Sequence, residues 1–389
     1  MNIFLIYITA FELNKHIVCL HQKLTGISFR TVPTDSKGTA HILEHSVLQG
    51  SHKYPVKDPF LHMMKGSLNT YLNAMTYNDR TVYPIASRNS VDYLNLLKVY
   101  LDAVFYPLCV DPKGKFVFEQ EGWRYGVSND LSQTLGYQGV VYSEMKGVYS
   151  NPISVLGREA QSLLFPDNTY HFDSGGNPQE IPNLTYSEFA KFYHHHYHPS
   201  NAQIFASGTT EDVIAAMDAT SAVLKNFDLN DEVRPYTAIP YQKKTFTSPK
   251  YKVVPFAATS KEQNKLEAEK GQGLVSLTWL LNEEEMDAYT DLLFTVLDYL
   301  LLGTDSSPLK KSLEHSNLGD SVIADGYESY LLQSTFSVGL KDVSDKAQRS
   351  FNKLVMDTLQ DIVQNGFDSD DIEAAINTIE FSVSKFFQF

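Results

Sequence analysis

The sequence predicts an α+β protein in which antiparallel sheets pack against long helices, arranged as two related domains. Helical patterns alternate with short strand-like runs along the chain, and the helices often come in pairs. A stretch rich in Pro and polar residues divides the 389 residues near the middle. Since 43% of the residues are hydrophobic, the chain has enough apolar mass for two sizeable cores.

The clearest predicted helix is 90–105, where apolar side chains recur on one broad face. The other predicted helices are 187–197, 210–224, 283–302 and 344–364, and the predicted strands are 26–32, 80–85, 202–207, 273–281 and 333–338. Residues 1–11 are apolar but too few to span a bilayer, and they lack the positive flank of a signal peptide. We expect them to form a buried strand.

The domain boundary is expected where helical and strand patterns give way to prolines and charge. We predict a first domain over 1–226, a linker or surface loop over 227–272, and a second, structurally related domain over 273–389. The last residues contain three phenylalanines directly after a helical pattern, so we expect the second domain to be truncated at its C-terminus.

The charge and the cysteine count exclude several classes of function. The formal net charge of −14 argues against a nucleic-acid partner, because neutralising phosphates requires clustered Lys and Arg. Cys19 and Cys109 are the only two cysteines, too few for a disulfide framework or a Cys-rich metal site. No segment favours a membrane partner.

Residues 41–45, with the sequence HILEH, form the motif that carries chemistry. On a helix, positions i and i+4 share a face, so His41 and His45 can offer nitrogens to one metal ion. Glu44 lies beside them without needing to bind the metal, where a carboxylate can accept a proton from water. The alternative is an exposed helix that carries two unrelated histidines.

Two imidazoles leave a zinc site incomplete, so a third ligand must come from elsewhere in the chain. Glu144 lies in a segment that has the pattern of a strand edge running into a helix, although a surface glutamate fits that pattern equally well. The histidines at 194–196 and 198 resemble a second metal tract, but we interpret them as packing residues at a helix end. The Ser-Gly-Gly at 174–176 is interpreted as a loop.

Several separated segments together resemble one known family. They are HILEH itself, GSHKYPVKDPF (50–60), SLNTYLNAMTYNDRTVYP (67–84), QEGWR (120–124), GVVYSEMKGVYS (139–150) and residues 163–202. In these segments the chain resembles the presequence protease and falcilysin branch of the pitrilysin-like, or inverzincin, zinc metallopeptidases. The similarity runs from about residue 8 to 379 and corresponds to the N-terminal half of such proteins.

The resemblance implies the identity of the site residues. One Zn²⁺ would be held by His41, His45 and Glu144 in a catalytic first domain, and Glu44 would act as the base. An edge strand containing Asn73 and Ala74 would pair with the backbone of a peptide substrate. Three further residues are candidates for an apolar pocket near the scissile bond, with plain core packing as the alternative: Leu48, Phe60 and Met64.

The resemblance also implies a function. We expect a zinc endopeptidase that degrades short unstructured peptides, such as cleaved presequences, in the mitochondrial matrix. The family's C-terminal half, which normally contributes an arginine and a tyrosine to the site, is expected as a partner, and this chain alone is expected to be weakly active or inactive. Asn151 replaces an acidic residue that often supports the metal in related branches. The alternative function is a non-catalytic subunit that binds peptides or serves as a scaffold.

Overall fold

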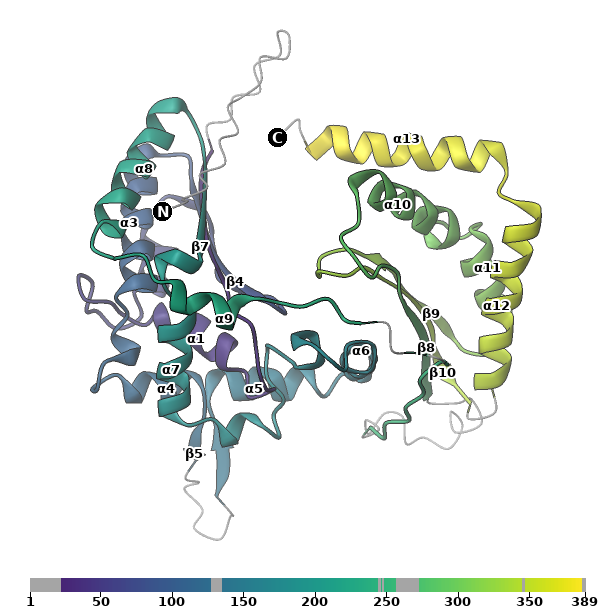
Figure 1. Ribbon diagram of the computed structural model, residues 1–389, viewed down its shortest axis with the longest axis horizontal. Coiled ribbons are helices and arrows are strands. Elements are labelled where there is room, and N and C mark those ends of the chain that lie inside the picture. Colours follow the sequence, from purple (N-terminus) through teal and green to yellow (C-terminus); the bar gives the residue numbers. More distant parts are fainter. Residues whose placement is uncertain are drawn as a thin grey trace. The chain divides into compact units, whose positions relative to one another are not determined.

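The computed structural model describes residues 22–126, 135–243, 246, 248–256, 273–344 and 347–386 (Figure 1). By its contacts the chain forms two compact units, one of 1–149 with 172–239 and the other of 150–171 with 240–389. The strand predicted over residues 1–11 lies outside the described residues. The fold class is confirmed, since both units combine helices with antiparallel sheets.

The main sheet of the first unit has five strands, and all of its strand pairs are antiparallel. They are β1 (Lys23–Arg30), β2 (Asn69–Leu72), β3 (Met75–Thr76), β4 (Arg80–Ser87) and β7 (Ala202–Ser207). The order is β2-β4-β1-β7, and β3 also pairs with β4. Side chains of β1 alternate between buried and half-buried, as in a strand with one face against a core.

Helices of different length accompany this sheet. The longer ones are α1 (Thr39–Val47), α3 (Ser90–Phe105), α5 (Val140–Val148), α7 (Tyr186–His196) and α8 (Thr210–Leu224), and the shorter ones are α2 (Pro59–Gly66), α4 (Lys115–Glu121) and α9 (Arg234–Thr237). A separate antiparallel pair is formed by β5 (Arg124–Gly126) and β6 (Gly136–Gln138). Helix α3 is capped by Asn89, whose side chain accepts hydrogen bonds from the backbone N–H groups of Val91 and Asp92.

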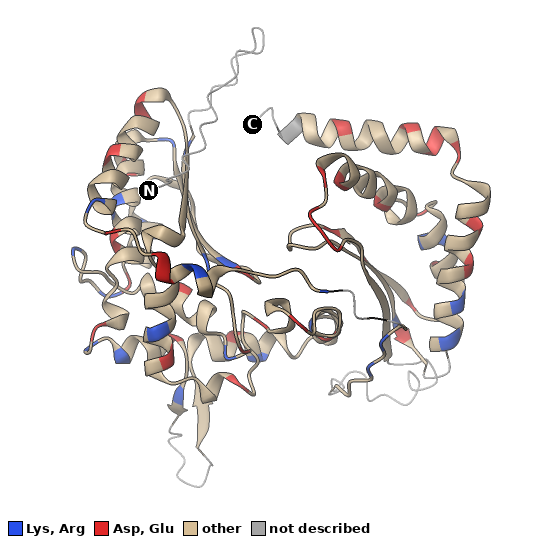
Figure 2. Ribbon diagram, viewed as in Figure 1, with Lys and Arg blue, Asp and Glu red and all other residues tan. Residues whose placement is uncertain are grey.

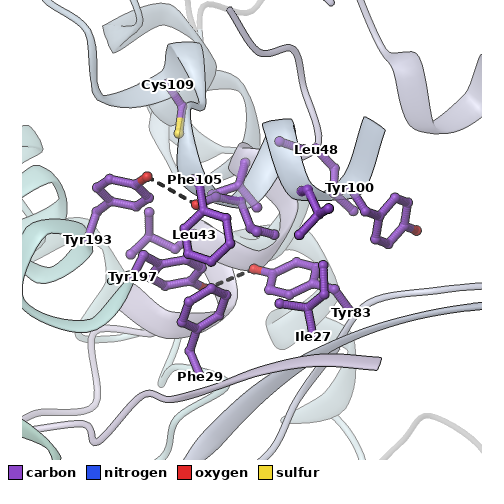
Figure 3. Close-up of a cluster of buried hydrophobic side chains, with 14 of the residues drawn as sticks. Ile27, Phe29, Leu43, Leu48, Tyr83, Tyr100, Phe105, Cys109, Tyr193 and Tyr197 are labelled. Atoms are coloured by element: carbon purple, nitrogen blue, oxygen red, sulfur yellow. Dashed lines mark hydrogen bonds between the residues drawn. The ribbon is translucent and has the colours of Figure 1, made fainter. Parts of the chain in front are cut away.

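An aromatic core joins β1 and β4 to the helices α1, α3 and α7 (Figure 3). Phe29 stacks on Tyr197 with ring centroids 4.6 Å apart. The hydroxyl of Tyr197 lies 2.8 Å from that of Tyr83, which satisfies both polar groups inside the core. Helix α1 contributes Leu43 to the same cluster, so the core fixes the helix that carries the HILEH motif.

The second unit contains a three-stranded sheet in the order β8-β10-β9. Its strands are β8 (Gly273–Leu280), β9 (Ser321–Glu328) and β10 (Thr335–Val343), and its helices are α6 (Pro152–Leu164), α10 (Ala288–Leu302), α11 (Pro308–Glu314), α12 (Gln348–Asn365) and α13 (Ser369–Phe386). Leu309, Val338 and Phe351 are completely buried in a core of their own. Each unit therefore has a separate hydrophobic cluster.

Residues 150–171 belong to the second unit although the first unit surrounds them in sequence. The side chain of Gln242 accepts a hydrogen bond from the backbone N–H of Asp167 and donates one to its carboxylate. The Gln242 backbone N–H donates in turn to the buried side chain of Gln333. These amide contacts attach the segment after α6 to the residues that precede β10. The functional assignment of 1–226, 227–272 and 273–389 stays a prediction.

The predicted elements agree closely with the structure where they are long. Helices 90–105 and 210–224 and strand 202–207 have the predicted bounds. Helix 283–302 begins later, at Ala288, because the side chain of Asp287 caps it by accepting from two backbone N–H groups. The elements missed by the prediction include short ones, such as β2, β3 and α4, and longer ones, among them α6 with 13 residues and β9 with 8 residues.

In the part of the chain that the structure describes, no helix combines the length and apolar character required to cross a bilayer. Acidic residues recur along α12 and α13 (Figure 2), in keeping with the net charge of −14.

Candidate metal centre

Helix α1 places His41 and His45 one turn apart on the same face. Their ring centroids are 5.0 Å apart, and the two side chains are largely but not fully buried, with 11% and 24% of their surface exposed. The helix starts directly after Gly38, whose φ of 69° is the left-handed conformation that glycine adopts without strain. The predicted geometry of the HILEH segment is therefore present.

Glu144 comes from α5 and faces the two histidines. Its Oε2 lies 3.7 Å from Nε2 of His41 and 3.8 Å from Nε2 of His45. Ligand atoms of these three residues all lie within 4.8 Å of one another, which makes them a group suited to a metal ion. The Glu144 side chain is half exposed, so one side of the group is accessible to solvent.

The other ring nitrogens of the histidines have partners of their own. His41 Nδ1 lies 3.0 Å from the carbonyl oxygen of Gly175, and His45 Nδ1 lies 3.3 Å from Oε2 of Glu121. Both acceptors require a proton on Nδ1, so each Nε2 keeps its lone pair for a metal. Glu121 is almost fully buried on α4, with 3% of its surface exposed.

This donor set fits zinc. Nitrogen and oxygen ligands of tetrahedral zinc lie about 2.0–2.2 Å from the ion and hence roughly 3.3–3.6 Å from each other. The separations of 3.7 and 3.8 Å between Glu144 and the histidines are close to that value. Two imidazoles and one carboxylate also leave a fourth position open, as in catalytic zinc sites.

Close backbone contact brings the carbonyl of Gly175 to His41. A Cβ atom on Gly38 would lie 2.8 Å from the Gly175 oxygen, and one on Gly176 would lie 2.8 Å from the Gly38 Cα. Glycine is therefore required on both sides of this contact. The Ser-Gly-Gly segment is a loop, as predicted, and its carbonyl also orients His41.

Glu44 is 8% exposed and lies on α1 beside the group. Its Oε2 accepts a 2.8 Å hydrogen bond from the hydroxyl of Thr76 on β3. This bond orients the carboxylate of Glu44, and Glu44 itself is not part of the three-residue metal group. The arrangement suits a proton acceptor next to a metal.

The negative charge of the surroundings acts on His45. Burial works to lower the pKa of His45, but the hydrogen bond to Glu121 and the charges of Glu44, Glu121 and Glu144 outweigh it and raise the pKa. The same carboxylates that favour the imidazolium would favour a divalent cation in this position.

The residues predicted to bind substrate lie in different environments. Asn73 and Ala74 separate β2 from β3 at an edge of the sheet, and the carbonyl of Asn73 accepts from the hydroxyl of Tyr100. Leu48 is 6% exposed and belongs to the core, Phe60 packs against that core, and Met64 is 48% exposed on α2. Their roles toward a substrate stay predictions.

The histidine tract packs against the protein, as expected. His196 is buried at the end of α7, where Nδ1 lies 2.8 Å from the carbonyl oxygen of Phe192 and Nε2 lies 3.3 Å from that of Tyr236. His195 stacks on the ring of Tyr236. Among the described residues, His41, His45 and Glu144 form the only metal-suited group of three, which does not include the tract. Asn151 caps α6 through the backbone N–H of Ile153.

The sequence did not predict the residues that orient the site residues by hydrogen bonds. Glu121 and Thr76 lie within segments that carry the family resemblance, but nothing in their spacing links them to the HILEH segment. Gly175 acts through its backbone carbonyl, which no side-chain pattern encodes.

Two family models match two separate stretches of the chain. Residues 30–108, which include the HILEH segment, match "Insulinase (Peptidase family M16)", and residues 183–379 match "Peptidase M16 inactive domain". The chain belongs to peptidase family M16. Glu144 lies between the two matched ranges.

Curated relatives place the chain in the presequence protease branch. Presequence protease 1, chloroplastic/mitochondrial, of Arabidopsis thaliana is 47% identical over 361 residues, which cover 93% of this chain and 32% of the relative. Protein HypA of Clostridium perfringens is 43% identical, and the match covers 36% of its length. The mitochondrial presequence protease of Mus musculus is 37% identical, and the match covers 34% of its length. This M16 chain thus spans about a third of the length of these relatives.

Solved structures confirm the pitrilysin-like fold. A protease from Helicobacter pylori has a TM-score of 0.67 at 16% identity, with 95% of this chain and 80% of the other aligned. Pitrilysin has a TM-score of 0.57 at 17% identity, with 90% of this chain and 35% of the other aligned.

Proposed function

We propose that this M16 chain is the metal-binding part of a zinc endopeptidase that degrades short unstructured peptides, such as cleaved mitochondrial presequences. The observation that carries the proposal is the convergence of the two free Nε2 atoms and Glu144, with Glu44 alongside. The names of the relatives, which include presequence proteases of mitochondria and chloroplasts, support the substrate class and a mitochondrial location, for which we propose the matrix.

The proposed mechanism assigns one task to each group. His41, His45 and Glu144 would hold zinc, which when bound supplies Lewis acidity and makes water a stronger acid. Glu44, held by Thr76, would accept the proton of the attacking water and pass it to the leaving amine. A peptide paired with the edge at Asn73 and Ala74 would be fixed along its backbone before cleavage.

The proposed partner of this chain is a polypeptide that corresponds to the other two thirds of the relatives' length. A chamber completed by that part would admit unstructured peptides and exclude folded proteins. We therefore expect the isolated chain to bind zinc but to cleave peptides weakly or not at all. The acidic side chains of Glu44 and Glu144 would favour peptides with the basic character typical of targeting sequences.

A second candidate function is a non-catalytic subunit that binds peptides. The match of residues 183–379 to an "inactive domain" model favours it. The two functions differ in the need for Glu44, because a binding subunit has no use for a proton acceptor next to the metal.

The test combines zinc content with cleavage of a basic unstructured peptide. The chain should bind one zinc per molecule, and cleavage should be measured after it is supplied with the remaining part of a full-length relative. Glu44→Gln should keep the zinc and lose at least ~10²-fold in kcat, whereas Glu211→Gln on α8 should match the wild type. A fully active Glu44→Gln protein would exclude the mechanism, and zinc-free wild type would exclude the metal site.

A further inference from the structure

Glu121 is a buried carboxylate to which the proposed mechanism assigns no role. It lies on α4 with 3% of its surface exposed, and α4 packs against α1. A charge in such a position is costly unless a hydrogen-bonded partner compensates it. The partner has to be found in the contacts of its two oxygens.

The two oxygens of Glu121 have different neighbours. Oε2 lies 3.3 Å from Nδ1 of His45, and Oε1 accepts a 2.8 Å hydrogen bond from the side-chain amide of Gln120. The amide is neutral and fixes the direction of the carboxylate. His45 is therefore the metal-site residue whose N–H group stabilises the buried carboxylate of Glu121.

We propose that Glu121 is a positioning residue that tunes the metal affinity of the site through His45. This inference rests on the proposed zinc function. By accepting a hydrogen bond from Nδ1–H, the carboxylate sets the tautomer and the ring plane of His45, so that Nε2 points toward Glu144. It also makes His45 a more basic ligand, which strengthens its bond to a cation.

The two histidine ligands are thus supported unequally. His41 donates to a neutral backbone carbonyl at Gly175, whereas His45 donates to a buried carboxylate. The His45 contact is longer, at 3.3 Å against 3.0 Å, but its acceptor carries a full negative charge and therefore acts more strongly on the imidazole. Loss of the Glu121 charge should therefore weaken metal binding through His45, while the contact of His41 remains intact.

The experiment measures zinc affinity of the 389-residue chain by competition with a chromogenic chelator. Glu121→Gln removes the charge and keeps the shape, and it should weaken zinc binding by ~10- to 100-fold. Glu119→Gln is the matched control, because Glu119 lies on the same helix, pairs with Lys115 and has a side chain 43% exposed. The control should bind zinc as the wild type does.

The outcomes separate the two proposals. A wild type that takes up no zinc overturns the proposed function. A wild type that binds zinc, with Glu121→Gln within twofold of it, overturns the positioning role alone.

If the Glu121→Gln variant does not fold, the proposal can be tested on the wild type alone. Histidine ¹⁵N NMR of the zinc-loaded wild type should show a slowly exchanging Nδ1 proton on His45 and the metal on Nε2. The opposite tautomer would contradict the proposal.

Discussion

Thr76 links the edge of the sheet to the proposed base. Its hydroxyl donates to Glu44 over 2.8 Å, and its backbone belongs to β3, which pairs with β4. A hydrogen bond to a charged group contributes about 1.5–3 kcal/mol, which corresponds to roughly 10- to 100-fold in rate if it is needed in the transition state. This contact couples the edge proposed for the substrate to the residue proposed for proton transfer.

Thr76→Val should therefore lower kcat by about tenfold or more, with KM and zinc affinity close to those of the wild type. Thr76→Ser keeps the hydroxyl and should restore most of the rate. Steady-state cleavage of an unstructured peptide by the completed protease gives both constants. Equal kcat values for the Val and Ser variants would show that the hydrogen bond has no role.

His196 gives the first unit a predictable dependence on pH. Burial lowers the pKa of His196 to about 4, while its value in the unfolded chain is about 6.5. Between these values the unfolded state binds more protons, so the free energy of unfolding falls as the pH drops from about 6.5 to 4. The loss should reach roughly 2–3 kcal/mol.

His196→Phe should remove most of this acid sensitivity, because phenylalanine fills the buried site with an aromatic ring that does not titrate. Urea unfolding at several pH values measures the effect. His194→Phe, at an exposed position on the same helix, serves as the control and should retain the wild-type dependence. A His196→Phe protein that loses stability with acid as steeply as the wild type would contradict the assignment.

At the scale of elements, the start of α1 depends on glycine at one point. Gly38→Ala would place a Cβ 2.8 Å from the Gly175 carbonyl in a backbone conformation with φ of 69°. The expected cost is ~1–3 kcal/mol in the free energy of unfolding, and the displaced carbonyl should weaken zinc binding through His41. Urea unfolding and chelator competition measure the two effects.

Gly157→Ala is the matched control for that substitution. Gly157 lies inside α6, and a Cβ there would meet nothing within 4 Å. Alanine in a helix interior should stabilise the protein by ~0.5–1 kcal/mol. Opposite signs at the two glycines are expected, and a neutral Gly38→Ala would show that the loop can shift without cost.

The elements also show what sequence reasoning could and could not reach. Helices 90–105 and 210–224 extend over four turns, so their apolar periodicity is unambiguous. Helix α4 has seven residues and β3 has two, too few to establish a period. The HILEH segment is local and was recognised directly, whereas the supporting contacts of Glu121 and Thr76 depend on tertiary packing across 76 and 32 positions.

At the scale of the whole molecule, two separate hydrophobic clusters predict two unfolding events. One cluster contains residues of the first unit, and the other contains residues of the second. The chain has two tryptophans, and Trp123 lies in the first unit while Trp279 lies in the second. Each unit therefore carries its own fluorescent reporter.

Removal of zinc should affect these reporters differently. A ligand at 100 times its Kd stabilises the folded form by about 2.7 kcal/mol, and all three proposed ligands lie in the first unit. In Trp279→Phe, where Trp123 reports alone, a chelator should lower the Tm by several degrees. In Trp123→Phe, the Tm seen by Trp279 should stay constant. Equal shifts in both variants would mean that the two cores unfold as one, and a shift confined to Trp279 would place the metal outside the site formed by α1 and α5.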